Sequence, residues 1–400
     1  MASNLYTNIR WTLQSDSPLP IHARYRFRKA FRAYAEDNLL LAFLEMLACL
    51  DSLSKTEALK NEVASQARKA PSMIKGRAFA LSAEQCLPLE NYVLFVFENL
   101  FGSFAAAQSH RQAFKRHCAS VISDPTGSIS DRINPLFLVS ALGEVENQQL
   151  LAIAEKQYRM TRIKREGKLR LKEVISFLKL LIKRRENPEN FSGKALIFGP
   201  AYDRQTPPGI HHEETLIRVN QIPDPDLSHF EYKGNCDRLY LNAEFFEKKR
   251  AETIELARRD RLRVYLREKH AEKESMKAGN PSIFYSYQRP KNLFISGYAN
   301  MIQGVCYSLL REGFHEARLS GIDFYSGSVL YRAEHYSADK ELNETLKTLR
   351  KHNLIENFAF IKLLYNVGMI TAADKASESV HLSLEEYAEI LDERIGRPCE

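Results

Sequence analysis

Cysteine is scarce in this 400-residue chain, and its six cysteines are scattered. None forms a Cys-x-x-Cys pair, and no histidine stands at the spacing of a zinc site. A disulfide-stabilised domain has a much higher density of cysteine. The sequence therefore indicates neither a disulfide framework nor a metal site, and a reducing cytoplasm fits it best.

Long apolar runs are also missing. The first 20 residues lack the apolar core of a signal peptide. The longest apolar stretch, residues 92–107, is interrupted by Glu98, Asn99 and Gly102, and it is shorter than the roughly 20 residues that cross a bilayer. We expect a cytoplasmic protein, either soluble or peripheral to the inner membrane.

The charge is moderately basic, with 57 Lys and Arg against 50 Asp and Glu. This excess favours anionic partners such as nucleotide phosphates, acidic lipids or nucleic acid, without choosing among them. The length and a hydrophobic content of 44% allow two cores. Two domains are therefore expected.

The pattern of apolar residues along the chain changes near residue 190. From residue 21 to 185, apolar residues recur three and four apart, and breaks fall at proline and glycine, which predicts helix after helix. The change predicts an all-α helical domain over residues 1–190 and a second domain over 191–400.

Residues 156–185 contain twelve Lys or Arg among regularly spaced apolar residues. They fit a basic amphipathic helix that rests on an anionic membrane surface or on nucleic acid. The alternative is the solvated face of a long helix that joins the domains. Residues 248–273 are a second basic stretch, also expected to be helical.

After residue 190, short apolar or β-branched runs alternate with helical segments, which predicts a parallel α/β sheet. The expected strands are residues 194–201, 215–220, 238–242, 293–295 and 317–324. Ligands of such sheets lie beyond the carboxyl ends of the strands. The polar or tightly turning residues that close these runs include Gly199, Pro200, Asn220, Gln221, Asn242 and Asp323.

Residues 319–334 contain a Gly-Ile-Asp-Phe-Tyr strand end, and a second tyrosine follows six residues after the first, at Tyr325 and Tyr331. This segment resembles the bacterial sialyltransferases of glycosyltransferase family 42. Residues 352–364 resemble that family's segment in which a histidine, here His352, opens a helix.

Two upstream segments are similar to the same family. Residues 216–221 resemble its Arg-x-Asn-Gln strand, and Gly199-Pro200 resembles its first glycine-rich strand end. Residues 296–300 could stand in for its Thr-Ser-Gly segment. The resemblance extends over residues 194–375.

The resemblance implies an inverting, metal-independent transfer on a Rossmann-like (GT-A-type) domain with a small lid at about residues 326–351. It implies His352 as the general base, with Tyr325 and Tyr331 as donors to the departing phosphate. Asn220 and Gln221 would contact the donor, a CMP-activated sugar that serves as substrate, so no separate cofactor is expected. The acceptor would be a hydroxyl of a bacterial surface glycan.

The first strand end departs from the family pattern Gly-Asn-Gly-Pro-Ser, because Phe198 and Ala201 replace its asparagine and serine. The donor is therefore open between CMP-sialic acid, CMP-Kdo and CMP-linked pseudaminic or legionaminic acid. A non-catalytic scaffold or binding protein is the alternative outside the enzyme class. A nucleic-acid-binding protein is a third alternative. The expectation, however, is that the protein has no nucleic-acid partner.

Several side chains have competing interpretations. His335 is a rival base. The run at residues 211–214, His-His-Glu-Glu, suits a surface turn better than a metal site, because adjacent histidines do not share a helix face. Asp224 and Asp226 mimic a metal clamp, but Pro223 and Pro225, which alternate with them, favour a rigid loop. Asp323 is expected to fix the loop that presents Tyr325.

Overall fold

In the computed structural model, every described element before residue 191 is helical. The helices are α2 (Ile21–Ala35), α3 (Leu39–Leu53), α4 (Glu57–Lys69), α5 (Pro88–Phe101), α6 (Phe104–Ser123), α7 (Pro135–Ser140), α8 (Asn147–Arg159) and α9 (Arg165–Glu186), with short 3-10 turns at Ala83–Gln85 and Pro188–Asn190. The structure describes residues 18–36, 38–54, 57–69, 81–124, 134–159, 165–199, 210–220, 236–278, 283–290, 292–297, 299–326, 349–350 and 352–396.

Helix α5 is the centre of this helical region. It begins at Pro88, whose ring suits the first helical turn. The Glu90 carboxylate accepts a hydrogen bond of 2.7 Å from the Leu87 backbone N–H, which satisfies one of the free donors at the helix start. Residues 90–101 are all buried, because neighbouring helices cover α5 on every side.

The second half contains a seven-stranded sheet in which every pairing is parallel. The strand order is β5-β4-β3-β2-β1-β6-β7. The strands are β1 (Gly193–Phe198), β2 (Glu214–Val219), β3 (Arg238–Tyr240), β4 (Arg263–Arg267), β5 (Phe284–Tyr287), β6 (Phe314–Ser320) and β7 (Ile370–Ala372). Helices separate most of them, so the fold is α/β.

The sheet is buried on both faces, as an all-parallel sheet requires. Alternate residues of the strands join different cores: Tyr240 and Tyr265 belong to the main core, while their chain neighbours Leu239 and Val264 belong to a second one. The helices of this half are α10 (Ala243–Lys248), α11 (Arg250–Asp260), α12 (Glu268–Ala278), α13 (Met301–Glu312), α15 (Leu354–Asn366), α16 (Asp374–His381) and α17 (Leu384–Leu391), followed by the π-helical turn η5 (Asp392–Gly396). Residues of α10, α11 and α12 belong to the second core, and residues of α9, α13 and α15 belong to the main one.

Four of the five expected strands form, at β1, β2, β3 and β6. The expectation of a strand at 293–295 is wrong, because the Ile295 backbone N–H donates to the Glu356 carboxylate, at 2.8 Å, instead of to a strand. The expectation of one helical stretch over 248–273 is also wrong, since β4 lies within it. The basic stretch 156–185 is divided between the end of α8 and α9.

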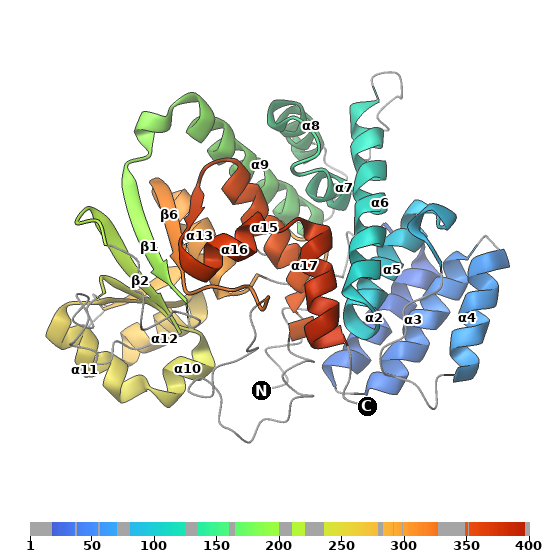
Figure 1. The fold of residues 1–400 in the computed structure, drawn as a ribbon, viewed down its shortest axis with the longest axis horizontal. Coiled ribbons are helices and arrows are strands. Elements are labelled where there is room, and N and C mark those ends of the chain that lie inside the picture. The colour runs from blue at the N-terminus through green and yellow to red at the C-terminus, as the bar shows by residue number, and fades with distance from the viewer. Residues whose placement is uncertain are drawn as a thin grey trace.

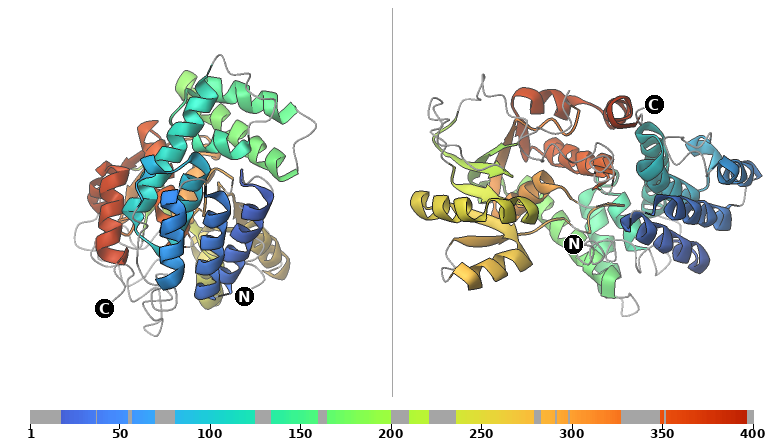
Figure 2. Two further views of the ribbon diagram at one scale, coloured as in Figure 1. Left: turned by 90° about the vertical axis from the view of Figure 1, so that its right-hand side faces the viewer. Right: turned by 90° about the horizontal axis from the view of Figure 1, so that it is seen from below.

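Figures 1 and 2 show an elongated arrangement with the sheet towards one end, helices α2–α6 towards the other, and α15 and α17 between them. One continuous cluster of buried apolar residues extends from Leu19 in the helical half to Ile395. In the part of the chain that the structure describes, no helix combines the length and apolarity needed to cross a membrane.

Candidate functional site

The sheet reverses its winding direction between β1 and β6. Strands β2 to β5 lie on one side of β1, while β6 and β7 lie on the other. This switch point is where open α/β sheets bind ligands, beyond the carboxyl ends of the strands. The Gly199 N–H donates to the Ser320 carbonyl at 2.9 Å, and a Cβ on Gly199 would lie 2.6 Å from the Gly321 oxygen. Only glycine allows this close approach.

Asn220 and Asn242 meet at the same edge, beyond β2 and β3. The Asn220 Oδ1 accepts a hydrogen bond of 2.8 Å from the Asn242 backbone N–H. The Asn242 Oδ1 accepts one of 2.7 Å from the Phe245 N–H and so caps α10. Neither amide nitrogen bonds to a described residue, so both can donate to a ligand.

The chain leaves β6 in a tight turn that presents Tyr325. The Asp323 Oδ1 accepts from the Tyr325 N–H at 3.0 Å, as expected of a residue that fixes this loop. The Asp323 carbonyl accepts from the Ser326 N–H at 2.8 Å and from the Ser379 hydroxyl at 3.2 Å. The Tyr325 side chain is partly buried against the main core.

Tyr387 of α17 supports this turn, and sequence reasoning did not find it. Its hydroxyl donates to the Phe324 carbonyl at 2.7 Å, and its ring stacks on Phe358 with centroids 4.0 Å apart. Burial, and then the nearby Tyr325 and Asp323, raise the pKa of Tyr387 well above its ordinary value. The Tyr387 hydroxyl therefore remains a donor at neutral pH.

His352 lies directly before α15 and is partly buried. The following residue, Asn353, caps α15 by accepting from the Glu356 N–H at 3.2 Å, and its Nδ2 donates to the Ser296 hydroxyl at 2.7 Å. A Cβ on Gly297 would lie 2.8 Å from the His352 carbonyl oxygen. The segment 296–297 thus packs against His352, although it lies 55 residues earlier in the chain.

The tyrosine and histidine segments are connected through their neighbours. The Phe324 ring meets the Phe358 ring of α15 at 5.6 Å between centroids, edge to face. Tyr325 and His352 thus lie on two segments packed together through α15.

Several residues singled out in the sequence lie outside the described residues: Pro200, Gln221, Asp224, Asp226, Tyr331, His335 and all of the expected lid except residues 326, 349 and 350.

Strained backbone gathers in these segments. Among the described residues, five other than glycine have a positive φ, and four of them belong here: Asn220 (51°), Phe324 (49°), Tyr325 (67°) and Asn353 (50°). Such a conformation costs about 1–3 kcal/mol and tends to persist at functional sites. For two successive aromatic residues it is especially uncommon.

The metal interpretations gain no support from the described residues, which contain no group of three or more His, Cys, Asp or Glu placed to hold an ion. The His212 side chain is 97% exposed, and Glu213 pairs with Lys194 at 2.9 Å. The run at 211–214 includes a turn and the start of β2.

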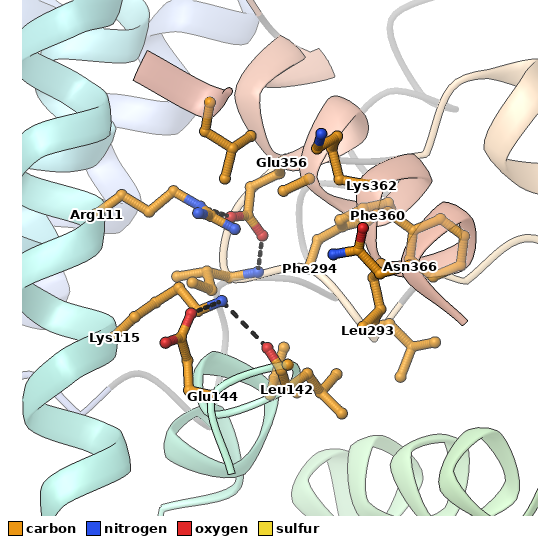
Figure 3. A pocket seen from close by; sticks show the side chains of 16 residues that line it. Arg111, Lys115, Leu142, Glu144, Leu293, Phe294, Glu356, Phe360, Lys362 and Asn366 are labelled. Carbon is orange, nitrogen blue, oxygen red and sulfur yellow. Dashed lines mark hydrogen bonds and ion pairs between the residues drawn. The ribbon is translucent and has the colours of Figure 1, made fainter. Parts of the chain in front are cut away.

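A cavity of about 150 Å³ lies between α6, residues 293–295 and α15 (Figure 3). None of the predicted site residues lines it. Arg111 and Lys115 extend into it from α6 and meet Glu356 and Glu144. The cavity therefore marks a junction between the helical half and α15, and it is distinct from the strand ends.

The basic stretch is less uniformly exposed than its charge suggests. The Arg170 guanidinium is buried and donates to the Phe294 carbonyl at 3.2 Å, and Arg184 donates to the Gly368 carbonyl. Lys179 pairs with Glu155 of α8 at 2.7 Å. Lys172 and Lys183 remain on the exposed face of α9.

Comparison with known proteins found no match to a protein-family model, a curated protein or a solved structure. The functional assignment therefore depends on these residues and their placement.

Proposed function

We propose that the chain is an inverting, metal-independent glycosyltransferase that moves sialic acid or a related ulosonic acid from a CMP-sugar to a hydroxyl of a bacterial surface glycan. The supporting observation is the meeting of Gly199, Asn220, Asn242 and Asp323 at the carboxyl edge of one parallel sheet, beside the strained turn of Tyr325. In this proposal residues 191–400 are a Rossmann-like GT-A-type domain with a lid, and residues 1–190 are an α-helical domain.

The chemistry requires few groups. The bond from the anomeric carbon to the phosphate oxygen breaks, the acceptor oxygen bonds to that carbon from the opposite face, and His352 takes the acceptor proton. General-base assistance of this kind contributes about 10²–10⁴-fold. Hydroxyl donors from Tyr325 and Tyr331 meet the charge that grows on the phosphate, as preorganised donors do elsewhere.

The proposal is tested by incubating the purified chain with CMP-sialic acid, CMP-Kdo and CMP-linked pseudaminic acid, and measuring CMP release in excess EDTA. One donor is expected to turn over without a divalent cation. His352→Ala and Tyr325→Phe should each reduce kcat by about 10²-fold or more. His22→Ala and Tyr25→Phe, which change exposed residues of α2, are the matched controls.

A wild-type chain that binds no CMP and releases none from any donor would favour the scaffold alternative. So would folded His352→Ala and Tyr325→Phe variants with unchanged turnover.

We also propose a cytoplasmic enzyme held near lipid-linked acceptors by the exposed cations of α9. The wild type should sediment with anionic vesicles at low salt. The variant with both Lys172→Glu and Lys183→Glu should remain in the supernatant. Equal sedimentation of both would remove this part of the proposal.

A further inference from the structure

The backbone just before His352 is bonded to the end of α5. Arg350 Nη1 donates to the Asn99 carbonyl at 3.1 Å and to the Gly102 carbonyl at 3.0 Å. In return, Asn99 Nδ2 donates to the Arg350 carbonyl at 2.9 Å. The Arg350 guanidinium also lies 4.7 Å from the centroid of the Phe104 ring. The last carbonyls of a helix lack intrahelical donors, so a guanidinium is a suitable partner for them.

The segment just after His352 is bonded to α6 through a side chain of α15. One turn into α15, Glu356 Oε1 accepts a hydrogen bond from Arg111 Nε, and Glu356 Oε2 accepts from the Ile295 N–H at 2.8 Å (Figure 3). Arg111 and Glu356 are 5% and 4% exposed, so this ion pair is buried. Through Ile295 it also holds the segment 296–297 that packs against His352.

Helix α6 is in turn fixed to the C-terminal part of the chain. The Asp392 carboxylate accepts from the Phe104 N–H at 2.6 Å and the Ala105 N–H at 2.9 Å, at the start of α6. The same carboxylate accepts from the Ser103 hydroxyl at 2.5 Å. The segments on both sides of His352 are thus bonded to α5 and α6, and α6 is itself bonded to Asp392. We call this set of contacts the frame of His352.

Stability alone is a weak reason for such a frame. A buried ion pair is often no more stabilising than well-packed apolar residues of the same volume, because both charges lose their hydration. A proton acceptor, by contrast, must be placed precisely, and an error of 1 Å costs about 10²-fold in rate.

We propose that Arg111, Glu356 and Arg350 are positioning residues that hold His352 in the geometry for proton transfer, which makes the N-terminal helices part of the catalytic unit. This inference rests on the proposed function for its meaning. The position of His352 can nevertheless be measured without turnover.

The test uses the full chain with Arg111→Met and Glu356→Gln combined. The glutamine oxygen can still accept from the Ile295 N–H, and no unpaired charge is left in the core. The matched control is Arg318→Met with Glu214→Gln, because that pair joins β6 to β2 at 2.6 Å, with Glu214 at the opposite end of β2 from Asn220. The readouts are the urea midpoint, the titration and linewidth of the His352 imidazole by NMR, and kcat and KM for the active donor.

With Arg111 and Glu356 replaced, the His352 resonance should shift or broaden, and kcat should fall about 10–100-fold with KM within about twofold. The control should change the midpoint comparably and leave the His352 resonance and kcat as in the wild type. An unchanged His352 titration and linewidth in the folded double variant would overturn the inference. A wild type without turnover would contradict the proposed function only. The His352 resonance would still test the positioning inference.

Discussion

At the scale of single residues, the turn after β6 holds two aromatic residues in a left-handed backbone conformation. Phe324 and Tyr325 have φ values of 49° and 67°. Their own side chains oppose this geometry, at about 1–2 kcal/mol per residue. The Asp323 carboxylate and the Tyr387 hydroxyl compensate by bonding to the backbone of the turn.

Tyr387→Phe removes the donor to the Phe324 carbonyl without creating a cavity. The variant should lose about 1–2 kcal/mol of unfolding free energy, because a buried carbonyl is left without its partner. Urea unfolding followed by circular dichroism measures this loss. Tyr365→Phe is the control, since the Tyr365 hydroxyl bonds to no described residue; equal midpoints for the two variants would contradict the prediction.

At the scale of helices and strands, α5 and α6 are joined by a buried histidine. His110 Nδ1 donates to Asn91 Oδ1 at 2.6 Å, and burial lowers the pKa of His110 to about 4, partly opposed by Glu84. The unfolded value is about 6.5. The unfolded chain therefore binds the proton more readily, so this contribution to stability is complete above pH 6.5 and is lost as the pH falls towards 4.

His110→Gln should remove this dependence while keeping a donor to Asn91. Between pH 8 and pH 5, the wild type should lose about 2 kcal/mol more unfolding free energy than the variant does. Urea titrations at pH 8, 6 and 5 give the difference, from which the contributions of carboxylates common to both proteins cancel. Parallel pH profiles for the two proteins would show that folding does not lower the pKa of His110.

The sequence predicted the helices before residue 190 and the strands β1, β2, β3 and β6, because helical spacing and β-branched runs are local signals. It missed β4, β5 and β7, which have three to five residues each; β4 is also flanked by charge. The apolar residues 293–295 looked like a strand, but their backbone pairs with Glu356 of a distant helix.

The strand-end residues could be predicted from their order along the chain, since parallel strands bring their carboxyl ends to one edge. The supporting residues could not. Tyr387, Ser379 and Arg350 act through contacts with residues 53 to 252 positions away, and nothing local marks them. The left-handed backbone of Phe324 and Tyr325 also depends on these tertiary contacts, because no local preference of an aromatic residue favours it.

At the scale of the whole molecule, the helical and sheet-containing halves share one core and a set of polar contacts. If residues 1–190 are removed, Glu356 loses its ion-pair partner Arg111, and Arg350 loses the carbonyl groups of α5 to which it donates. The apolar side chains of α15 and α17 that join the shared core would then meet water. Exposed apolar area costs roughly 25 cal/mol per Å², which is large against a net stability of about 5–15 kcal/mol.

Residues 191–400 expressed alone should therefore fail to form a cooperative fold. The fragment should bind a dye that reports exposed apolar surface and lose near-ultraviolet circular dichroism while keeping much of its helical signal. The full chain should show one urea transition by both far- and near-ultraviolet signals. Co-expression with residues 1–190 is the control that should restore the transition. A sharp transition in the isolated fragment, at the midpoint of the full chain, would show that the sheet-containing half is an independent domain and that its contacts with α5 and α6 add no net stability.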